Sequence, residues 1–167
     1  QLINALLNFS RYQNGLQTLT LAPCSIDDLL EHARLRFQDQ AQEKDIILSI
    51  EAEEPLPRLH ADRVQLERVL DNLLDNALRH TPENGLIRLQ ARRHGERVII
   101  SIEDNGEGIA YGQQGRIFEP FVQVGRKKGG AGLGLALCKE IVQLHGGRMG
   151  VYSRPGQGTQ FYMALPL

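Results

Sequence analysis

Glycine is concentrated in one part of this chain: fourteen of its seventeen glycines lie between residues 106 and 158, and only Gly15, Gly85 and Gly95 precede them. Glycine lacks a Cβ atom, so it permits positive φ angles and close approach of the backbone to a ligand. We therefore expect regular helices and strands in the first hundred residues, and a binding site formed largely by the main chain in the glycine-rich remainder.

Hydrophobic periodicity predicts four helices and six strands, because apolar residues recur at three- and four-residue steps in some segments and alternate in others. Ser25 and Asp62 are expected N-caps, while Ala22-Pro23 is expected to end the first strand. The order of elements is neither a steady βαβ alternation nor all-β, so we predict an α+β two-layer sandwich. The expected helices span residues 2–12, 26–41, 62–80 and 133–145, and the expected strands span 18–21, 46–52, 86–92, 97–103, 149–153 and 159–165.

Charge and cysteine content argue against several classes of function. Nineteen Lys and Arg against twenty Asp and Glu give a net charge of −1, so no overall field favours nucleic acid or an anionic membrane. Cys24 and Cys138 have no metal-ligand spacing and cannot form a disulfide framework, which suits a reducing compartment. The longest apolar stretches, such as residues 98–100, are too short to cross a bilayer. Because Gln1 falls within a helical pattern and is not Met, we expect a piece of a longer protein.

Polar residues follow one face of the helix predicted at 62–80. Asn72, Asn76, Arg79 and His80 are separated by steps that bring them together on a helix. A carboxamide oxygen is a hard, neutral ligand that suits Mg²⁺, a cation that takes most of its other ligands from water and phosphate. The alternative is that each asparagine hydrogen-bonds a neighbouring strand, which is the usual role of an isolated Asn.

The run Asp104-Asn105-Gly106-Glu107-Gly108-Ile109 directly follows a predicted strand. A carboxylate at a strand end can accept a hydrogen bond from the exocyclic amine of adenine, which would select adenine over guanine. Gly106 and Gly108 would let backbone and water approach the ring. A D-x-G-x-G pattern can equally be no more than a turn, so it is a weak signal when taken alone.

A glycine-rich segment, residues 129–135, opens the helix expected at 133–145. Free N–H groups and the positive end of a helix then converge where glycines permit close approach, which favours phosphate binding. The spacing fits neither the Walker P-loop nor the dinucleotide-binding fingerprint. A flexible linker is the alternative, but buried-type apolar residues resume at once.

A basic run, Arg126-Lys127-Lys128, precedes these glycines. Such a run is usually a solvated loop. Lying between an aromatic segment and the glycines, it could also close over a triphosphate as a lid. We expect Phe118 and Phe121 to anchor the near end of that lid in the core.

Taken in order, these motifs resemble those of the ATP-binding catalytic domain of sensor histidine kinases, within the GHKL (Bergerat-fold) ATPase superfamily, over residues 19–166. Residues 72–77 are similar to the N box, 104–108 to the G1 box and 118–121 to the F box. Residues 130–135 resemble the G2 box, and 156–159 the short G3 box. The resemblance implies a mixed, mostly antiparallel sheet of about five strands covered by three helices.

The resemblance also implies two ligands, ATP and Mg²⁺, and a role for each matched residue. Asn76 would ligand Mg²⁺, Asn72 would assist at the phosphates, and Arg79 would stand where the family usually has a phosphate-contacting Lys. His80 takes the common Tyr position beside the base, and Asp104 would bind the adenine amine. The other implied nucleotide contacts are Gly106, Gly108, Ile109, Phe118, Arg126, Lys127, Lys128, Gly130, Gly132, Leu133, Gly134, Leu135 and Thr159.

Asn72 bears on the reaction type. Hydrolysing members of the superfamily place a Glu four residues before the metal Asn, where it activates water as a general base. In this chain that position is Asn72. A histidine kinase needs no such base, because its nucleophile is an imidazole with a lone pair. The resemblance therefore implies an ATP-dependent protein-histidine kinase whose phosphoryl group passes on to an Asp of a response regulator.

None of the five histidines has the H-E-x-x-[TN]-P context of the family's phosphorylated His, so we expect the acceptor outside this sequence. Residues 1–17 are expected to be the end of a dimerisation and phosphoacceptor hairpin, and residues 18–167 the catalytic domain. The expected partners are this hairpin and a response regulator, with a homodimeric parent and a monomeric fragment that contacts neither nucleic acid nor membrane. The fragment would be the cytoplasmic portion of an inner-membrane sensor.

Two alternatives with the same fold stay open. One is a nucleotide-sensing interaction module, in which ATP orders the lid and thereby changes a protein interface. The other is a kinase of Ser on an anti-sigma-antagonist partner, against which the hairpin-like residues 6–11 argue. A hydrolase of the superfamily is disfavoured by Asn72.

Overall fold

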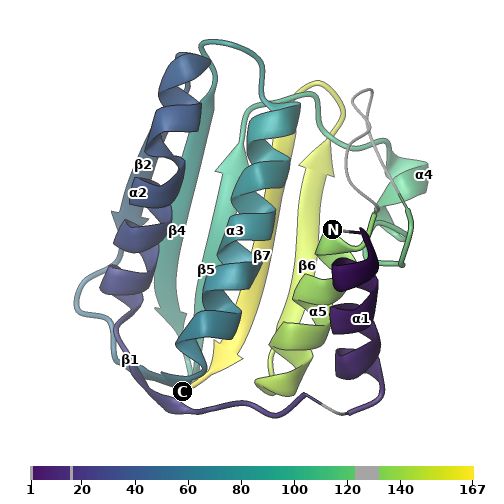
Figure 1. Ribbon diagram of the computed structural model, residues 1–167. Helices are drawn as coiled ribbons and strands as arrows, with labels where there is room; N and C mark the ends of the chain where they lie inside the picture. Colours follow the sequence, from purple (N-terminus) through teal and green to yellow (C-terminus); the bar gives the residue numbers. More distant parts are fainter. Residues whose placement is uncertain (1, 16, 123–131) are drawn as a thin grey trace.

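The computed structural model describes residues 2–15, 17–122 and 132–167. Its elements form two layers, a five-stranded sheet and helices that cover one face of that sheet (Figure 1). The predicted α+β two-layer sandwich is therefore confirmed. The helices are α1 Leu2–Gln13, α2 Ile26–Glu43, α3 Arg63–His80, α4 Tyr111–Gln114 and α5 Gly134–Leu144. The strands are β1 Ala22–Cys24, β2 Ile47–Ala52, β3 Leu59–Ala61, β4 Leu86–His94, β5 Arg97–Asp104, β6 Arg148–Arg154 and β7 Gly158–Pro166.

The five-stranded sheet has the order β2-β4-β5-β7-β6. Strands β2 and β4 are parallel, and every other neighbouring pair is antiparallel, which confirms the expected mixed and mostly antiparallel sheet. The central strand β5 ends at Asp104, which lies opposite Ile87 of β4 and Thr159 of β7. The register thus brings two motifs that are far apart in the sequence to one edge of the sheet.

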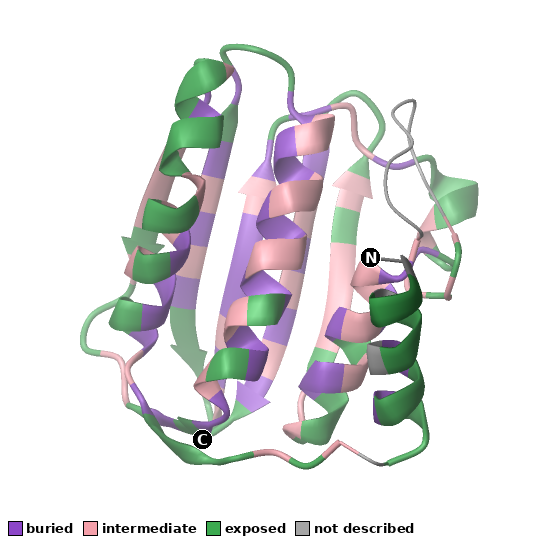
Figure 2. Cartoon of the chain, in the orientation of Figure 1, coloured by how far each residue is buried: buried purple, intermediate pink, exposed green. Residues whose placement is uncertain are grey.

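The core lies between the sheet and the helices, as the purple residues in Figure 2 show. Alternate residues of the central strands face the helices, and Ile100 and Ile102 of β5 are almost completely buried. Helix α3 presents fully buried leucines such as Leu66 and Leu70 to them. Each such side chain contributes about 1.5–3 kcal/mol, so α3 is held firmly over the centre of the sheet.

The first predicted strand is wrong in position. Residues 18–21 form no strand; instead β1 pairs antiparallel with β3, which the periodicity did not predict. The main-chain N–H of Thr20 donates to Asp62 Oδ2 at 2.9 Å, so this residue is held by a side chain and not by a ladder. Pro23 is tolerated because a two-stranded sheet consists of edge strands only. The one-turn helix α4 was also not predicted.

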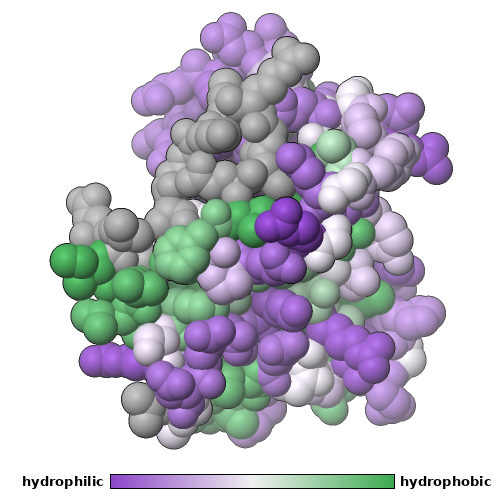
Figure 3. Space-filling model, turned by 90° about the vertical axis from the view of Figure 1, so that its right-hand side faces the viewer, coloured by the Kyte–Doolittle hydropathy of each residue, from purple (hydrophilic) through white to green (hydrophobic). Residues whose placement is uncertain are grey.

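Helix α1 packs along α5 (Figure 1). Phe9 is buried in a cluster with Leu133 and Ala136 of the α5 region, and the Tyr12 hydroxyl donates to Gln65 Oε1 of α3. Other apolar residues of α1, namely Ile3, Leu6 and Leu7, are exposed. Figure 3 shows hydrophobic side chains gathered on the side of the molecule where α1 lies. Among the described helices, none combines the length and the apolar character needed to cross a membrane.

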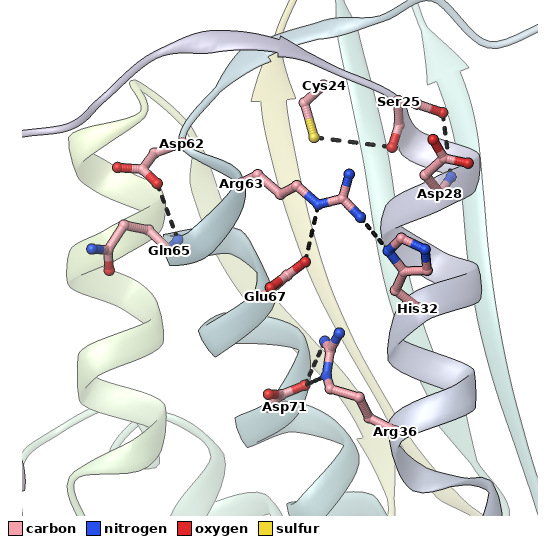
Figure 4. A network of polar contacts seen from close by, with 10 residues as sticks. All are labelled: Cys24, Ser25, Asp28, His32, Arg36, Asp62, Arg63, Gln65, Glu67 and Asp71. Carbon is pink, nitrogen blue, oxygen red and sulfur yellow. Dashed lines mark hydrogen bonds and ion pairs between the residues drawn. The ribbon is translucent and has the colours of Figure 1, made fainter.

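Polar contacts join the outer sides of α2 and α3 (Figure 4). Arg36 donates to Asp71 Oδ1 at 2.7 Å, and Arg63 donates both to Glu67 at 3.0 Å and to His32 Nδ1. Asp71 therefore points toward α2, away from the neighbouring Asn72 side of the helix. Each of these exposed pairs contributes little to stability. They occupy the face of α3 that is turned toward α2, so the face that carries Asn72 remains for the site.

Candidate functional site

Within the part of the chain that the structure describes, predicted site residues converge where three elements meet: the C-terminal end of α3, the carboxyl end of β5 and the N-terminal end of α5. The first two lie at the top of Figure 1. His80 Nδ1 lies 2.8 Å from Glu107 Oε1 in the loop after β5. A Cβ atom on Gly134 would lie 3.5 Å from Asn72 Oδ1. The N-box, G1-box and G2-box residues are thus brought together.

Asp104 is a buried carboxylate, only 6% exposed. The main-chain N–H of Gly106 donates to its Oδ1 at 2.9 Å. Burial raises the pKa of Asp104, while the N–H of Gly106, the nearby His80 and the N–H of Thr159 act in the opposite direction. A buried carboxylate that still has accepting capacity is stabilised in its ionised form by a ligand that donates to it.

Two glycines of the loop after β5 lie against other parts of the main chain. A Cβ atom on Gly106 would overlap the carbonyl oxygen of His80, and one on Gly108, whose φ is +74°, would overlap that of Arg154. We expected these glycines to admit a ligand. In the structure Gly106 packs against the end of α3 and Gly108 against the β6–β7 turn. These two contacts fix the position of the loop that follows Asp104.

Glu107 is a site residue that the sequence analysis did not single out. Besides its side-chain contact with His80, its N–H donates to the His80 carbonyl at 3.3 Å, and its own carbonyl accepts from Gly156 N–H at 2.6 Å. A contact between the end of α3 and the G1 box could have been suspected from the histidine at the end of one and the acid in the other. Glu107 therefore joins α3 to the G3 turn.

Arg79 forms an ion pair with Asp75 one turn earlier, at 2.6 Å. Both side chains are substantially exposed, at 40% and 48%. A pair of this kind is worth about 0–1 kcal/mol. The guanidinium can therefore exchange this partner for an anionic ligand at little cost.

Ser153 of β6 is a second site residue that was not predicted. Its Oγ accepts from the N–H of Ile109 at 2.8 Å and lies 2.9 Å from Thr159 Oγ1 and from the Gly158 carbonyl oxygen. It therefore ties the loop after β5 to β7. No local pattern could have revealed it, because its partners come from two other segments.

Two hollows adjoin this junction. One, of about 390 Å³, is lined by Arg79, His80, Gly106 and Glu107 among others. The other, of about 400 Å³, includes Asp104, Ser153 and Thr159 in its wall. Polar side chains and glycine main chain thus surround an open space on both sides of the end of β5.

The start of α5 lies beside Asn72. Burial raises the pKa of the Cys138 thiol to about 12, with a hydrogen bond from the Asn72 side chain acting against this increase. Asn72 therefore lies at the contact between α3 and α5, and Asn76 is one turn closer to His80. Among the described residues, no side chain caps the N-terminus of α5, which leaves its N–H groups for a ligand.

The F-box aromatics differ from each other. Phe118 packs edge-to-face on Phe161, with ring centroids 6.1 Å apart, so its expected anchoring in the core is confirmed. The same expectation for Phe121 is wrong, because its side chain is 61% exposed. Its N–H donates instead to the Gly132 carbonyl at 2.9 Å, so main chain and not side chain holds this end of the segment.

The remaining predicted residues fall into two groups. Leu133 is buried and Leu135 is partly buried against the core, so both also serve packing. The proposed lid residues Arg126, Lys127 and Lys128, together with Gly130, lie outside the described residues.

Comparison with known proteins agrees with this geometry. Residues 61–167 match the family model HATPase_c, "Histidine kinase-, DNA gyrase B-, and HSP90-like ATPase". The chain is 65% identical over 166 residues to the alginate biosynthesis sensor protein KinB of Pseudomonas aeruginosa, an alignment that covers 99% of this chain and 28% of that protein.

Solved structures give the same result. Full-length ShkA in complex with AMPPNP is similar with a TM-score of 0.91 and 37% identity, over 99% of this chain and 35% of that one. The nucleotide-free catalytic domain of histidine kinase ThkA is similar with a TM-score of 0.80 and 28% identity, over 89% and 96%. The chain therefore belongs to the family of histidine kinase-, DNA gyrase B- and HSP90-like ATPases, in which its sequence and fold match the ATP-binding catalytic domains of sensor histidine kinases.

Proposed function

We propose that this domain binds Mg²⁺-ATP and directs its γ-phosphoryl group onto the imidazole of a histidine in a helical hairpin of the parent protein. The observation that carries the proposal is the position of Asp104, a buried carboxylate at the end of the central strand that lies in the wall of an open hollow lined mostly by polar residues. Membership of an ATPase family identifies the nucleotide as ATP.

The adenine end of the proposed site is Asp104 with Gly108 and Thr159. An ionised carboxylate only accepts hydrogen bonds, so it pairs with the exocyclic amine of adenine and would oppose the carbonyl oxygen of guanine. The raised pKa of Asp104 means that a donating ligand relieves part of the cost of burying its charge. We therefore expect selection of ATP over GTP.

The phosphate end of the proposed site is the start of α5 together with Asn76 and Arg79. The uncapped N–H groups of α5 and its positive helix end favour a phosphate. Arg79 can leave its exposed partner Asp75 to compensate phosphate charge. The carboxamide of Asn76 suits Mg²⁺, which when bound would offset the charge of the phosphate oxygens.

Phosphoryl transfer is favoured over hydrolysis by the environment of position 72. Asn72 is a neutral carboxamide, which cannot take a proton from water, and the adjacent Asp71 points toward α2 and pairs with Arg36, so it does not replace the general base that a hydrolase carries there. In the proposed reaction an imidazole nitrogen forms a bond to the γ-phosphorus, while the bond between the γ-phosphorus and the oxygen that bridges it to the β-phosphate breaks. The products are phosphohistidine and Mg²⁺-ADP.

The chain spans 28% of the length of KinB, so the rest of the reaction concerns a longer protein. We propose that residues 1–17 end a dimerisation and phosphoacceptor hairpin and that residues 18–167 form the catalytic domain. The exposed Ile3, Leu6 and Leu7 of α1 support this, since they offer an apolar face for hairpin packing. The parent is proposed to be a homodimeric inner-membrane sensor with this portion in the cytoplasm, and its phosphohistidine to supply an Asp of a response regulator.

The test begins with isothermal titration of this chain with AMPPNP and with the equivalent GTP analogue, each with and without Mg²⁺. We expect Mg²⁺-supported binding of the adenine analogue only. Asn76→Ala should remove the Mg²⁺ dependence, whereas the exposed control Asn14→Ala should bind as the unmodified chain does.

The second stage measures phosphohistidine formation from radiolabelled ATP in the parent sensor. Binding without any transfer in the parent would contradict a kinase and favour the interaction-module alternative. Equal binding of both nucleotides would contradict the role of Asp104.

A further inference from the structure

A lysine from another element reaches the C-terminal end of α3. Lys44 is the residue that follows α2, and its Nζ donates to the carbonyl oxygens of Leu78 at 2.6 Å and Thr81 at 2.7 Å. It is one of only four lysines in the chain. It lies outside the part of the chain that matches the family model, which begins at residue 61.

The end of α3 is a place where a cation has a strong effect. The last carbonyl groups of a helix have no intrahelical donor and carry the negative end of the helix dipole. Thr81 is buried, at 1% exposure, so its carbonyl group has little access to water. Pro82 follows and cannot continue the helix. The ammonium of Lys44 therefore supplies charge-assisted hydrogen bonds to groups that would otherwise lack them.

The main chain fixes Lys44 itself. Its N–H donates to the Ala41 carbonyl at 3.1 Å in the last turn of α2, and its carbonyl accepts from Asn84 N–H at 3.1 Å. Asn84 lies just beyond Pro82 in the turn that follows α3. Lys44 is thus joined to this turn through both its backbone and its side chain. These two attachments together fix the position of its ammonium group.

The residues between the two carbonyls are Arg79 and His80. On the opposite side, His80 contacts Glu107 through its ring and through its own carbonyl. The last turn of α3 is therefore held between Lys44 and the loop after β5. The buried Ala77 and Leu78 also hold this turn, and the Lys44 ammonium adds a polar attachment on the side opposite Glu107.

We propose that Lys44 is a positioning residue for the nucleotide site, which acts by holding the last turn of α3 so that Arg79 and His80 face the bound nucleotide. This inference rests on the proposed function. Lys44 itself contacts main chain on the far side of the helix, so its effect on the nucleotide passes through α3.

The test compares Lys44→Met, Lys44→Arg and the control Lys139→Met, an exposed lysine on α5. Affinity for Mg²⁺-AMPPNP is measured by titration well below the unfolding temperature, and amide hydrogen exchange is measured across residues 77–81. Lys44→Met should weaken binding about tenfold, a coupling of ordinary size within a hydrogen-bonded network, and speed exchange of the Thr81 amide. Lys44→Arg should restore binding to within about threefold, since guanidinium can also donate to two carbonyls.

Unchanged affinity and unchanged exchange in Lys44→Met would overturn the proposal. Faster exchange with unchanged affinity would also overturn it, because Lys44 would then only stabilise the helix end. If Lys44→Met does not fold, Lys44→Arg decides: a tenfold loss in a folded arginine variant contradicts a role that needs only two donors. Failure of the unmodified chain to bind AMPPNP would refute the proposed function, while the exchange measurement would still report on Lys44.

Discussion

Replacing Asp104 by Asn should separate nucleotide affinity from stability. The variant keeps the shape of the side chain, and its Oδ1 can still accept from Gly106 N–H. Its amide group would then point a donor at the amine of adenine, which is itself a donor. The lost interaction is a hydrogen bond to a charged acceptor, worth about 1.5–3 kcal/mol. Since 1.4 kcal/mol is a factor of ten, we expect the Kd for Mg²⁺-AMPPNP to rise about 10- to 150-fold.

The same substitution should weaken nucleotide binding but increase the stability of the fold at neutral pH. Burial raises the folded-state pKa of Asp104 above its unfolded value. The stability associated with this carboxyl is then complete below the unfolded pKa, about 3.9, and is lost as pH rises through the folded pKa. Asn does not titrate, so the variant should gain free energy of unfolding relative to the unmodified chain as pH rises from 3.5 to 7.

Titration calorimetry at pH 7 and urea unfolding at both pH values test these two expectations. Glu51→Gln is the control, because Glu51 lies on β2, which β4 separates from β5, and is 55% exposed near Arg88. Its affinity should stay within about twofold of the unmodified chain, in line with the small energy of exposed pairs. An Asp104→Asn variant that binds AMPPNP within threefold of the unmodified chain would refute the adenine contact. A variant whose free energy of unfolding does not rise relative to that of the unmodified chain between pH 3.5 and pH 7 would refute the cost assigned to burial.

Two further predictions concern the fold around the site. Gly108→Ala places a Cβ against the Arg154 carbonyl at a φ of +74°, so urea unfolding should show a loss of about 1–3 kcal/mol or more in the free energy of unfolding. The control Gly112→Ala, with open space around it, should change that free energy little. Equal stability of the two variants would contradict the packing of the G1 loop. Burial raises the pKa values of the Cys24 and Cys138 thiols, the latter to about 12. At pH 8 only about 10⁻⁴ of Cys138 is then thiolate. A disulfide reagent should therefore react promptly with both thiols in urea but not in the native protein.

Much of the fold could be predicted because its signals are local. Ser25 and Asp62 cap α2 and α3 as expected, accepting from the N–H groups of Asp28 and Gln65, and the leucines of α3 are buried as their periodicity predicts. The β1–β3 pair was not predictable, because three-residue strands show no measurable alternation and Pro23 argues against a strand.

The site residues divide in the same way, into those with a local sequence signal and those without one. Asp104 was predictable because a carboxylate directly after a buried strand is visible in the sequence itself. Ser153 and Lys44 were not, since each acts on segments that are distant in sequence. The prediction for Phe121 was wrong because an aromatic residue is usually buried, whereas Phe121 has a positive φ of 67° and an exposed side chain.

The burial of Phe9 against Leu133 and Ala136 has a thermodynamic consequence for the whole domain. Leu133 belongs both to the surface on which α1 rests and to the start of α5, so the two equilibria share one residue. A ligand that shifts Leu133 changes the free energy with which α1 docks. By reciprocity, the affinity for such a ligand would differ between docked and undocked α1 by the same factor as the ligand changes the docking equilibrium. The small cluster around Phe9 is therefore the contact through which the docking of α1 and the binding of a ligand at the start of α5 would influence each other.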